Sequence, residues 1–258
     1  MIENVTPLVI TYNEAANIAR TLDRLVWAQR IVVIDSGSTD ETLQLARSYP
    51  QVEIIHRPFD NFASQCNFGI DQVHTAWVLS LDADYELSTP FIDEIHRLCP
   101  EPETAGYRAN FVYRIYGRPL RGSLYPPRTV LYRKDRARYR NEGHGHRVMV
   151  EGKVLPLAEA IFHDDRKPLA SWFASQQRYA ANEAEYLLTA EPKILSRNDR
   201  IRLAAWPAPF GVFIYTLIVK GCVLDGWRGW YYALQRLLAE TLIALQIIDR
   251  RLRRINQA

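Results

Sequence analysis

The sequence predicts an α/β fold, in which a mostly parallel sheet carries helices on both faces and a C-terminal amphipathic helical region follows. Three observations predict it. In residues 1–104, short apolar runs alternate with segments of helical hydrophobic spacing, which is typical of β-α-β units. Residues 105–200 begin with alternating apolar and polar side chains, which are typical of half-exposed antiparallel strands. Beyond residue 200, a long uncharged stretch precedes a helix with one apolar side.

The elements of the first part follow in a regular order. Four apolar runs are expected to be strands, at residues 5–10, 30–35, 52–56 and 76–84, and each precedes a helical pattern, at residues 14–25, 39–49, 62–73 and 89–98. Two helix starts carry local signals, because Ser38 and Glu41 have capping-box spacing and Thr89 precedes Pro90. A helix between successive strands predicts that the strands run parallel.

The elements after residue 104 are predicted from alternation and aromatic spacing. Residues 106–117, 128–134 and 146–150 alternate apolar and polar side chains and are expected to be strands, with a turn at 150–154. Residues 171–188 predict a helix with large side chains available for burial, namely Trp172, Phe173, Tyr179, Tyr186 and Leu187.

The C-terminal part combines an uncharged stretch with an arginine-rich helix. Residues 203–227 are broken by Pro207 and Pro209, and roughly ten apolar residues remain before Lys220, short of the ~20 that span a bilayer. We interpret this stretch as a helix lying on or dipping into a membrane face; the alternative is a buried core helix. Residues 233–254 predict an amphipathic helix, whose arginines fit an anionic surface or, alternatively, only the helix dipole: Arg250, Arg251, Arg253 and Arg254.

Composition argues against several classes of protein. The chain is 48% hydrophobic and 24% charged, as globular proteins are, and its net charge of +3 is too mild to argue for nucleic acid. Cys66, Cys99 and Cys222 are odd in number and far apart, so neither a disulfide framework nor a cysteine zinc site is expected, and the thiols should be reduced in the cytoplasm. The N-terminus lacks the pattern of a signal peptide, so none is expected.

Three polar elements are expected to meet at one edge of the sheet. Expected strands end in TYNE, DSGSTDE and LDAD, and open α/β sheets bind ligands at the carboxyl ends of their strands. Asp35 can accept a hydrogen bond from a base, and Gly37 lets the backbone approach a ribose. Asp82 and Asp84 offer carboxylate oxygens, which Mg²⁺ and Mn²⁺ prefer. Each motif alone also fits a solvated turn or a capped helix, but their order and placement together predict a nucleotide-sugar site.

A divalent cation follows from the charge of such a donor. A diphosphate ~4 Å from a carboxylate is repelled by roughly 4 kcal/mol per charge pair at an effective dielectric near 20. A bound cation reverses the sign of that interaction and stabilises the departing diphosphate. The sequence therefore predicts Mg²⁺ or Mn²⁺ at the Asp-x-Asp motif.

These stretches resemble family 2 glycosyltransferases, which are inverting enzymes with a nucleotide-binding α/β fold of the GT-A type. The resemblance rests on VITYNEAANIARTLDRL, IVVIDSGSTDETLQLA, CNFGID and VLSLDAD. It implies that Asp35 meets the base and that Asp82 and Asp84 contact ribose, diphosphate and metal. It also implies that further residues line the nucleotide pocket or shape the donor site, Arg57 by the loosest match: Thr11, Tyr12, Glu14, Arg57 and Asn67.

The later part resembles a narrower branch, the lipopolysaccharide-core glucosyltransferase-like proteins. The matching stretches are VMVEGKV, AIFHDD and KGCVLDGWRGWYYAL. This resemblance implies a lipid-linked saccharide acceptor and a cytoplasmic enzyme on the inner face of the cell membrane. It also implies that His163 is a third metal ligand beside Asp84; the alternative is a structural histidine.

The catalytic base is expected within NEGHGHRVMV. Related proteins often carry a His-Glu pair here, but His146 stands where a carboxylate is expected. Either Glu142 supplies the carboxylate from a shifted loop, which we favour, or His146 acts as a neutral imidazole. A third interpretation is that the loop only turns the chain. A zinc site at His144 and His146 has weak support. Arg128 is predicted to be either a phosphate ligand or, as we favour, a charged side chain on the surface.

The resulting hypothesis is a metal-dependent inverting glycosyltransferase in three parts. Residues 1–104 bind the nucleotide-sugar, residues 105–200 form the acceptor side of the same catalytic domain, and residues 201–258 form a membrane-associated helical region. The expected partners are a nucleotide-sugar donor, expected to be UDP-linked, a lipid-linked saccharide and an anionic membrane surface, but no nucleic acid. The alternatives are a polyprenyl-phosphate glycosyltransferase and a catalytically degenerate binding or scaffold module.

Overall fold

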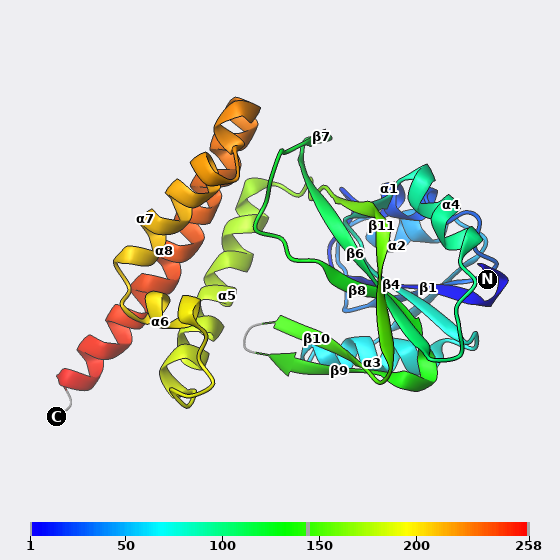
Figure 1. The fold of residues 1–258 in the computed structure, drawn as a ribbon, viewed down its shortest axis with the longest axis horizontal. Coiled ribbons are helices and arrows are strands. Elements are labelled where there is room, and N and C mark those ends of the chain that lie inside the picture. Colours follow the sequence, from blue (N-terminus) through cyan, green and yellow to red (C-terminus); the bar gives the residue numbers. More distant parts are fainter. Residues whose placement is uncertain (1, 143–144, 257–258) are drawn as a thin grey trace. The chain divides into compact units, whose positions relative to one another are not determined.

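The computed structural model describes residues 2–142 and 145–256, and the side chains of residues 3–140 and 147–256. The chain divides into two compact units (Figure 1). The sheet unit comprises Met1–Arg118 and Tyr125–Lys167, and the helical unit comprises Pro119–Leu124 and Pro168–Ala258.

Within the described residues, the sheet unit is built on a nine-stranded sheet in the order β3-β2-β1-β4-β8-β6-β11-β5, with β7 paired to β6. The first four strands in that order run parallel, as predicted. β8 is antiparallel to β4 and β6, β11 is parallel to β6, and β5 is antiparallel to β11. The strands are β1 Val5–Thr11, β2 Ile31–Asp35, β3 Val52–His56, β4 Trp77–Asp82, β5 Tyr85–Leu87, β6 Thr104–Ile115, β7 Arg118–Pro119, β8 Arg128–Arg133 and β11 Lys153–His163.

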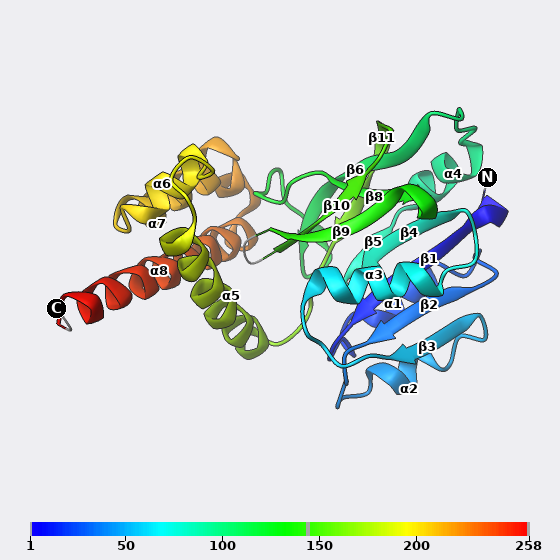
Figure 2. The same ribbon diagram turned by 90° about the horizontal axis from the view of Figure 1, so that it is seen from below.

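Further elements cover both faces of this sheet: α1 Ile18–Asp23, α2 Thr42–Ala46, α3 Phe62–Gln72, α4 Thr89–Arg97, β9 Ala137–Glu142 and β10 Gly145–Val150. Side chains alternate along each strand, so Ile31 and Val33 of β2 join a core cluster with α1 and α4. Val32 and Ile34 join a second cluster with α3 and the β9–β10 hairpin. Figure 1 shows the two layers on opposite sides of the sheet, and Figure 2 shows α3 lying across it. The predicted α/β class is confirmed.

Both predicted helix starts differ from those in the structure. α2 begins after the N-cap residue Glu41, so the capping box predicted at Ser38 is wrong. The Ser38 hydroxyl instead accepts from the Asn13 N–H (2.9 Å) and donates to the carboxylate of Asp35 (2.6 Å). α4 is capped by Ser88, one residue before the predicted Thr89, and the Ser88 hydroxyl accepts a backbone N–H of the first turn (3.1 Å).

The helical unit contains α5 Leu169–Thr189, α6 Arg197–Leu203, α7 Pro207–Ile214 and α8 Trp227–Ile255, with a π-helical turn at Tyr215–Val219 and a 3₁₀ turn at Cys222–Asp225. Its core gathers Ala184 and Leu187 of α5 with Leu195 and Ile247. Leu187 is therefore buried as expected, whereas Phe173 of the same helix is exposed. Among the described residues, every helix is too short or too polar to cross a membrane.

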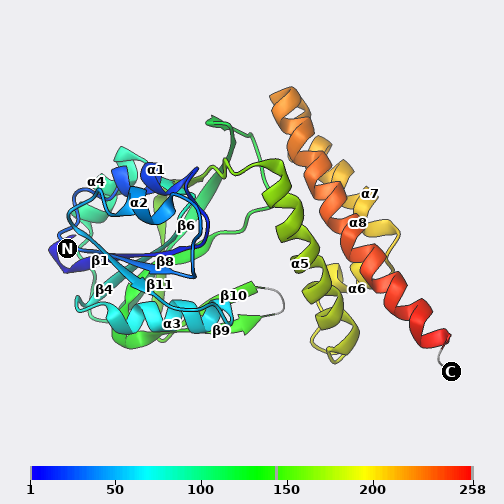
Figure 3. The same ribbon diagram turned by 180° about the vertical axis from the view of Figure 1, so that it is seen from behind.

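α7 and α8 lie side by side (Figure 3), and the start of α8 approaches the 3₁₀ turn so closely that only glycine fits at position 229. A Cβ added to Gly229 would lie 1.7 Å from the carbonyl oxygen of Cys222. We expect Gly229→Ala to lower the free energy of unfolding by about 1–3 kcal/mol, the usual range for overpacking.

The matched control for this substitution is Gly211→Ala in α7. A Cβ at Gly211 meets nothing within 4 Å. Alanine also favours helix over glycine, so this variant should be neutral or more stable by up to about 1 kcal/mol. Denaturant unfolding of both variants makes the comparison, and a Gly229→Ala protein as stable as the Gly211→Ala protein would contradict the steric argument.

Candidate active site

Strand registers bring the predicted acidic positions to one edge of the sheet. At the end of β1, Thr11 pairs with Asp35 of β2, and Ile10 pairs with Asp82 of β4. Because these strands are parallel, Asp35 and Asp82 lie at the same carboxyl edge, on either side of β1. Asp84 follows two residues after Asp82. The shared edge expected from the sequence is therefore confirmed.

The turn after β2 is closed by the carboxylate of Asp35. This buried group accepts hydrogen bonds from the N–H of Gly37 (2.8 Å), the N–H of Ser38 (3.1 Å) and the hydroxyl of Ser38 (2.6 Å). Gly37 has φ +94°, a conformation that other residues rarely adopt. The Nδ1 atom of the exposed His56 lies 3.5 Å from the Asp35 carboxylate. Asp35 thus shapes the turn, and its contact with a base stays a prediction.

The loop after β1 is joined to this turn by hydrogen bonds. The Asn13 N–H donates to the Ser38 hydroxyl (2.9 Å), and the Asn13 carboxamide oxygen accepts from the Thr39 N–H (2.8 Å). Two residues predicted to line the pocket flank this junction: Thr11 is buried, whereas Tyr12 is 48% exposed. The ends of β1 and β2 therefore form one connected wall, with Tyr12 accessible to a ligand.

Asp84 and His163 form a close pair at the same edge. His163 Nε2 lies 3.0 Å from Asp84 Oδ2, and each side chain is 13% exposed. The other carboxylate oxygen, Asp84 Oδ1, is buried without a hydrogen-bond partner. Burial opposes the ionisation of both groups, but His163 lowers the pKa of Asp84, and Asp84 raises the pKa of His163. A buried carboxylate oxygen without a partner is a suitable ligand for a hard cation.

The structure brings together only some of the predicted metal ligands. Among the described side chains, no group of three His, Cys, Asp or Glu residues is arranged to hold a metal ion. Asp84 and His163 are together, whereas Asp82 is half-exposed and has Arg128 Nη1 3.9 Å from its carboxylate. The Arg128 guanidinium also lies 4.8 Å from the centre of the Tyr125 ring. The chemistry of two carboxylates and one imidazole fits Mg²⁺ or Mn²⁺, and the three-ligand site stays a prediction.

Aromatic rings fix the position of His163. The ring centres of Tyr85, Tyr113 and Tyr125 lie 5.5, 4.7 and 4.6 Å from that of His163, all edge-on. The hydroxyls of Tyr85 and Tyr125 are hydrogen-bonded to each other. This packing holds the imidazole in place beside Asp84 and limits the access of water to it.

Glu14 is held by the chain segment that follows β11. Its carboxylate accepts from Lys167 Nζ (2.5 Å) and from the Asn17 side-chain amide (2.7 Å). Burial, followed by the nearby Asp84 carboxylate, raises the pKa of Glu14 to about 7, although Lys167 acts in the opposite direction. Burial lowers the pKa of Lys167, but Glu14 outweighs it and the net shift is upward. This charged pair therefore links the predicted nucleotide loop to the residues after His163.

Asp164 is a fully buried carboxylate that follows His163 directly in the chain. It accepts from Arg20 Nη1 (3.2 Å), from Arg166 Nη2 (2.8 Å) and from the N–H of Gly117 (3.3 Å). Its own N–H donates to the carbonyl oxygen of Asp84 (3.2 Å). Asp164 therefore ties α1 to the backbone that carries Asp84 and His163.

Two residues predicted at the donor site have partners within the protein. The carboxamide of Asn67 exchanges two hydrogen bonds with the backbone of Tyr139 in β9 (3.0 and 2.8 Å). The guanidinium of Arg57 makes a forked contact with Asp60 (2.8 and 3.0 Å). The backbone N–H of Arg57 donates to the carbonyl of Asp35 (2.9 Å). Asn67 thus anchors the β9–β10 hairpin on α3. The predicted donor contacts of both residues stay predictions.

Comparison with known sequences decides the family. Residues 8–152, more than half of the chain, match the sequence model of Glycosyl transferase family 2. The chain belongs to glycosyltransferase family 2. An uncharacterized glycosyltransferase of Rickettsia felis is 26% identical over 219 residues, which cover 79% of this chain and 77% of that protein. The lipopolysaccharide core biosynthesis glycosyltransferase LpsC of Rhizobium meliloti is 29% identical over 163 residues, 58% of each chain.

Comparison with solved structures agrees on the fold of this glycosyltransferase. The mannosyltransferase PcManGT from Pyrobaculum calidifontis, solved in complex with GDP-Man and Mn²⁺, superimposes with a TM-score of 0.53. The match covers 94% of this chain and 87% of that one, at 16% identity. The predicted GT-A fold and the predicted enzyme class are both confirmed.

The candidate bases of the glycosyltransferase lie on the β9–β10 hairpin. Glu142 ends β9 and is paired with Gly145 at the start of β10, while His146 is paired with Asn141. The side chains of Glu142 and His146 lie outside the described residues, and so does residue 144. The choice between the two bases stays a prediction.

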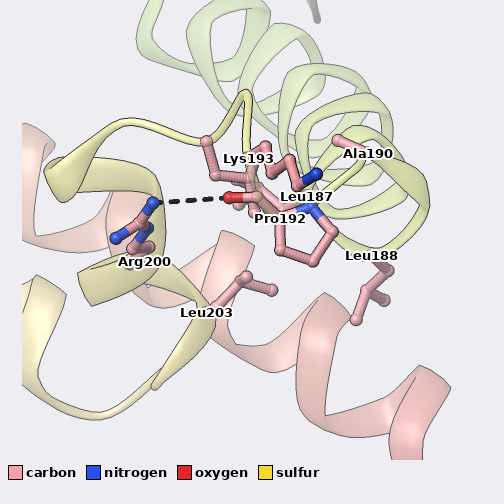
Figure 4. Close-up of a pocket in the computed structure, with 8 residues that line it drawn as sticks. Leu187, Leu188, Ala190, Pro192, Lys193, Arg200 and Leu203 are labelled. Atoms are coloured by element: carbon pink, nitrogen blue, oxygen red, sulfur yellow. Dashed lines mark hydrogen bonds between the residues drawn. The ribbon is translucent and has the colours of Figure 1, made fainter.

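A cavity of about 550 Å³ in the helical unit has a different chemistry (Figure 4). At its rim, Arg200 donates to the carbonyl oxygen of Pro192 (3.4 Å). The cavity is lined by Leu187, Leu188, Ala190, Pro192, Lys193, Leu195, Arg200 and Leu203. This lining contains no carboxylate and no histidine, so it offers no ligands for Mg²⁺ or Mn²⁺. The site with the expected chemistry is the sheet edge.

Sequence reasoning missed three residues that organise the site. The missed residues are the charged side chains of Asp164, Lys167 and Arg20, which lie within the site. None of them was a candidate site residue in the prediction from the sequence. The signal available was the run His-Asp-Asp-Arg-Lys at the end of an apolar stretch, in which four consecutive charged residues follow a candidate ligand. Such a run at a strand end predicts either a solvated loop or an ion-pair network, and here it forms a network.

Proposed function

We propose that this glycosyltransferase moves a sugar, with inversion, from a nucleotide-sugar to a hydroxyl of a lipid-linked saccharide such as lipopolysaccharide core, using Mg²⁺ or Mn²⁺. The observation that carries the proposal is the buried Asp84–His163 pair, with Asp84 Oδ1 unsatisfied, at the carboxyl edge beside the Asp35 turn. The name of LpsC supports the acceptor class. The complex of PcManGT with GDP-Man and Mn²⁺ supports the donor class and the metal.

The residues of the sheet edge have distinct roles in this proposal. Asp82, Asp84 and His163 would hold the cation, which supplies positive charge against the diphosphate leaving group. Arg128, 3.9 Å from Asp82, adds a further positive charge at that position. Tyr12 is an exposed side chain on the wall formed by the ends of β1 and β2, where it would be accessible to the nucleotide.

Inversion requires a single displacement at the anomeric carbon. The acceptor oxygen forms a bond to that carbon, the bond to the diphosphate oxygen breaks, and a base takes the hydroxyl proton. We assign the base to Glu142, with His146 as the alternative. A lipid-linked acceptor would place the enzyme on the cytoplasmic side of the inner membrane.

Donor turnover by the purified protein tests the proposal. Nucleoside diphosphate release is expected from a UDP- or GDP-sugar in Mn²⁺ or Mg²⁺, with loss on addition of EDTA and recovery on addition of excess Mn²⁺. The panel of donors identifies the nucleotide. No release from any common nucleotide-sugar with any divalent metal would contradict the proposal, and nucleotide binding without turnover would favour the degenerate binding module.

Substitution of the hairpin residues tests the assignment of the base. Glu142→Gln is expected to lower sugar transfer by about 100-fold, the lower end of general-base effects, while His146→Gln retains most of it. The opposite pattern would assign the base to His146. Transfer to undecaprenyl phosphate that neither substitution affects would show a phosphate acceptor, which is already ionised and needs no base.

A further inference from the structure

The outer face of α7 and of the turn that follows is apolar and exposed. Trp206 is 74% exposed, Phe210 64% and Ile218 60%. Phe210, Ile214 and Ile218 are spaced by four residues, which places them on one face of the continuous helical segment 207–219. Trp206, the N-cap residue of this segment, continues the same spacing. Residues 203–219 contain no charged side chain.

The opposite side of the same segment packs inside the helical unit. Ala208, Pro209, Thr216 and Leu217 are buried within the helical unit. A surface helix of a soluble protein turns its apolar stripe inward and its polar side outward. This helix instead exposes Phe210, Ile214 and Ile218, so the predicted alternative of a buried core helix is wrong. The apolar surface continues over the turn into α8, through Val223, Leu224, Trp227 and Trp230, all of which are exposed.

The charges around this surface are positive. Lys220 and Arg228 lie at its edge, and the Arg121 side chain is 64% exposed. The acidic residue of the turn, Asp225, is neutralised because it accepts from the Arg121 N–H (3.0 Å) and lies 3.5 Å from its guanidinium. A surface of tryptophan and aliphatic side chains with a cationic rim is complementary to an anionic bilayer interface.

We propose that this surface, Trp206 to Trp230, inserts into the headgroup region of an anionic membrane. The proposal deepens the proposed function and rests on it for the lipid-linked nature of the acceptor. Tryptophan rings are favoured at the depth of the headgroups, and the long Lys220 side chain reaches back towards water. The proposed membrane contact is therefore at residues 206–230, and not at the arginines at the end of α8 that the sequence suggested.

Those C-terminal arginines have partners in the helical unit. Arg250 donates to the carbonyl of Ala181 (3.0 Å), Arg251 donates to the carbonyl of Leu203 (2.7 Å), and Arg253 pairs with Asp249 (2.8 Å). They therefore contribute less to lipid binding than their number in the sequence predicts.

Vesicle flotation of the full chain tests the surface. The wild-type protein is expected to float with vesicles of phosphatidylcholine and phosphatidylglycerol. Phe210→Glu/Ile214→Glu should lower the partition coefficient at least tenfold, and melting temperature and circular dichroism verify that this variant folds. Ile194→Glu/Leu245→Glu is the matched control, because both residues are exposed apolar side chains of the helical unit outside the surface.

Three outcomes would overturn the proposal. The first is unchanged flotation of a folded Phe210→Glu/Ile214→Glu protein. The second is equal loss of flotation in the control, which would show only a general effect of charge. The third is a wild-type dimer in light scattering that this variant abolishes while vesicles bind nothing, which would make a second copy the occupant. Nucleotide release measured without lipid separates all three from a failure of the proposed function.

Discussion

Asp84→Asn is expected to lower the rate of sugar transfer by about 10³-fold, because charge stabilisation by a bound cation is worth several kcal/mol and each 1.36 kcal/mol is tenfold in rate. The substitution keeps the size of the side chain beside His163. It removes the anionic charge and replaces one of the two carboxylate oxygens with an amide nitrogen, which cannot bind a cation, so the buried Asp84 group becomes a much poorer ligand. The affinity for Mn²⁺ in the presence of nucleoside diphosphate, measured by calorimetry, should fall together with the rate.

Asp71→Asn is the matched control for this substitution. Asp71 is an aspartate of α3, half-exposed, and its carboxylate pairs with Arg138 at 3.0 Å. Exposed pairs of this kind contribute little, so transfer and Mn²⁺ affinity should both stay at the wild-type level. Wild-type transfer by the Asp84→Asn protein would remove Asp84 from the metal site.

Asp164→Ala is expected to lower the free energy of unfolding by about 3 kcal/mol or more, since removal of one partner from a buried ion pair leaves the other charge uncompensated. The guanidinium of Arg20 would lose its contact at 3.2 Å and that of Arg166 its contact at 2.8 Å. The loss of stability should lie near the lower end of the range of about 3–5 kcal/mol for broken buried pairs, because Arg20 keeps its ion pair with Glu86 at 3.6 Å.

Two further variants serve as comparisons for the Asp164→Ala protein in denaturant titrations. Glu53→Ala breaks an exposed pair with Arg30 (2.6 Å) and should change the free energy of unfolding by about 0–1 kcal/mol. Asp164→Asn retains an accepting oxygen for Arg20 and Arg166 and should recover part of the stability lost in the alanine variant. An Asp164→Ala protein as stable as Glu53→Ala would show that the buried network contributes little.

The sheet and its acidic edge were predictable because their signals are local. Each strand is a contiguous apolar run, and the polar residue that ends it is next in sequence, as in Ile34–Asp35 and Leu81–Asp82. Parallel order then requires that these ends meet at one edge. The fold class followed from the same pattern, and so did the shared edge of Asp35 and Asp82.

Helix lengths were less predictable because loop side chains compete for the backbone. The helix expected at 14–25 spans only Ile18–Asp23. The N–H of Glu14 donates to the Thr42 hydroxyl (2.7 Å) and that of Ala15 to the Asp40 carboxylate (3.2 Å). These partners belong to the neighbouring loop, and hydrophobic periodicity carries no information about them.

The pairing of partners in the charged network of the site could not be predicted from the sequence. Arg20 and Asp164 are 144 positions apart, and Glu14 and Lys167 are 153 positions apart. A charged residue in a sequence is equally consistent with a solvated side chain and a buried pair, and only the tertiary fold distinguishes them. The exposed apolar face of α7 was ambiguous for the same reason, since short apolar runs do not reveal which side they present.

The turn closed by Asp35 is complete without a ligand. The N–H groups of Gly37 and Ser38 already have an acceptor, and Asn13 fixes the adjoining loop. A donor would therefore meet a wall whose conformational freedom was lost when the chain folded, and little of its affinity would be consumed in ordering that wall. If the donor binds here as proposed, discrimination among nucleotides would depend on the fit to a preformed surface, not on adaptation of the loop to each ligand.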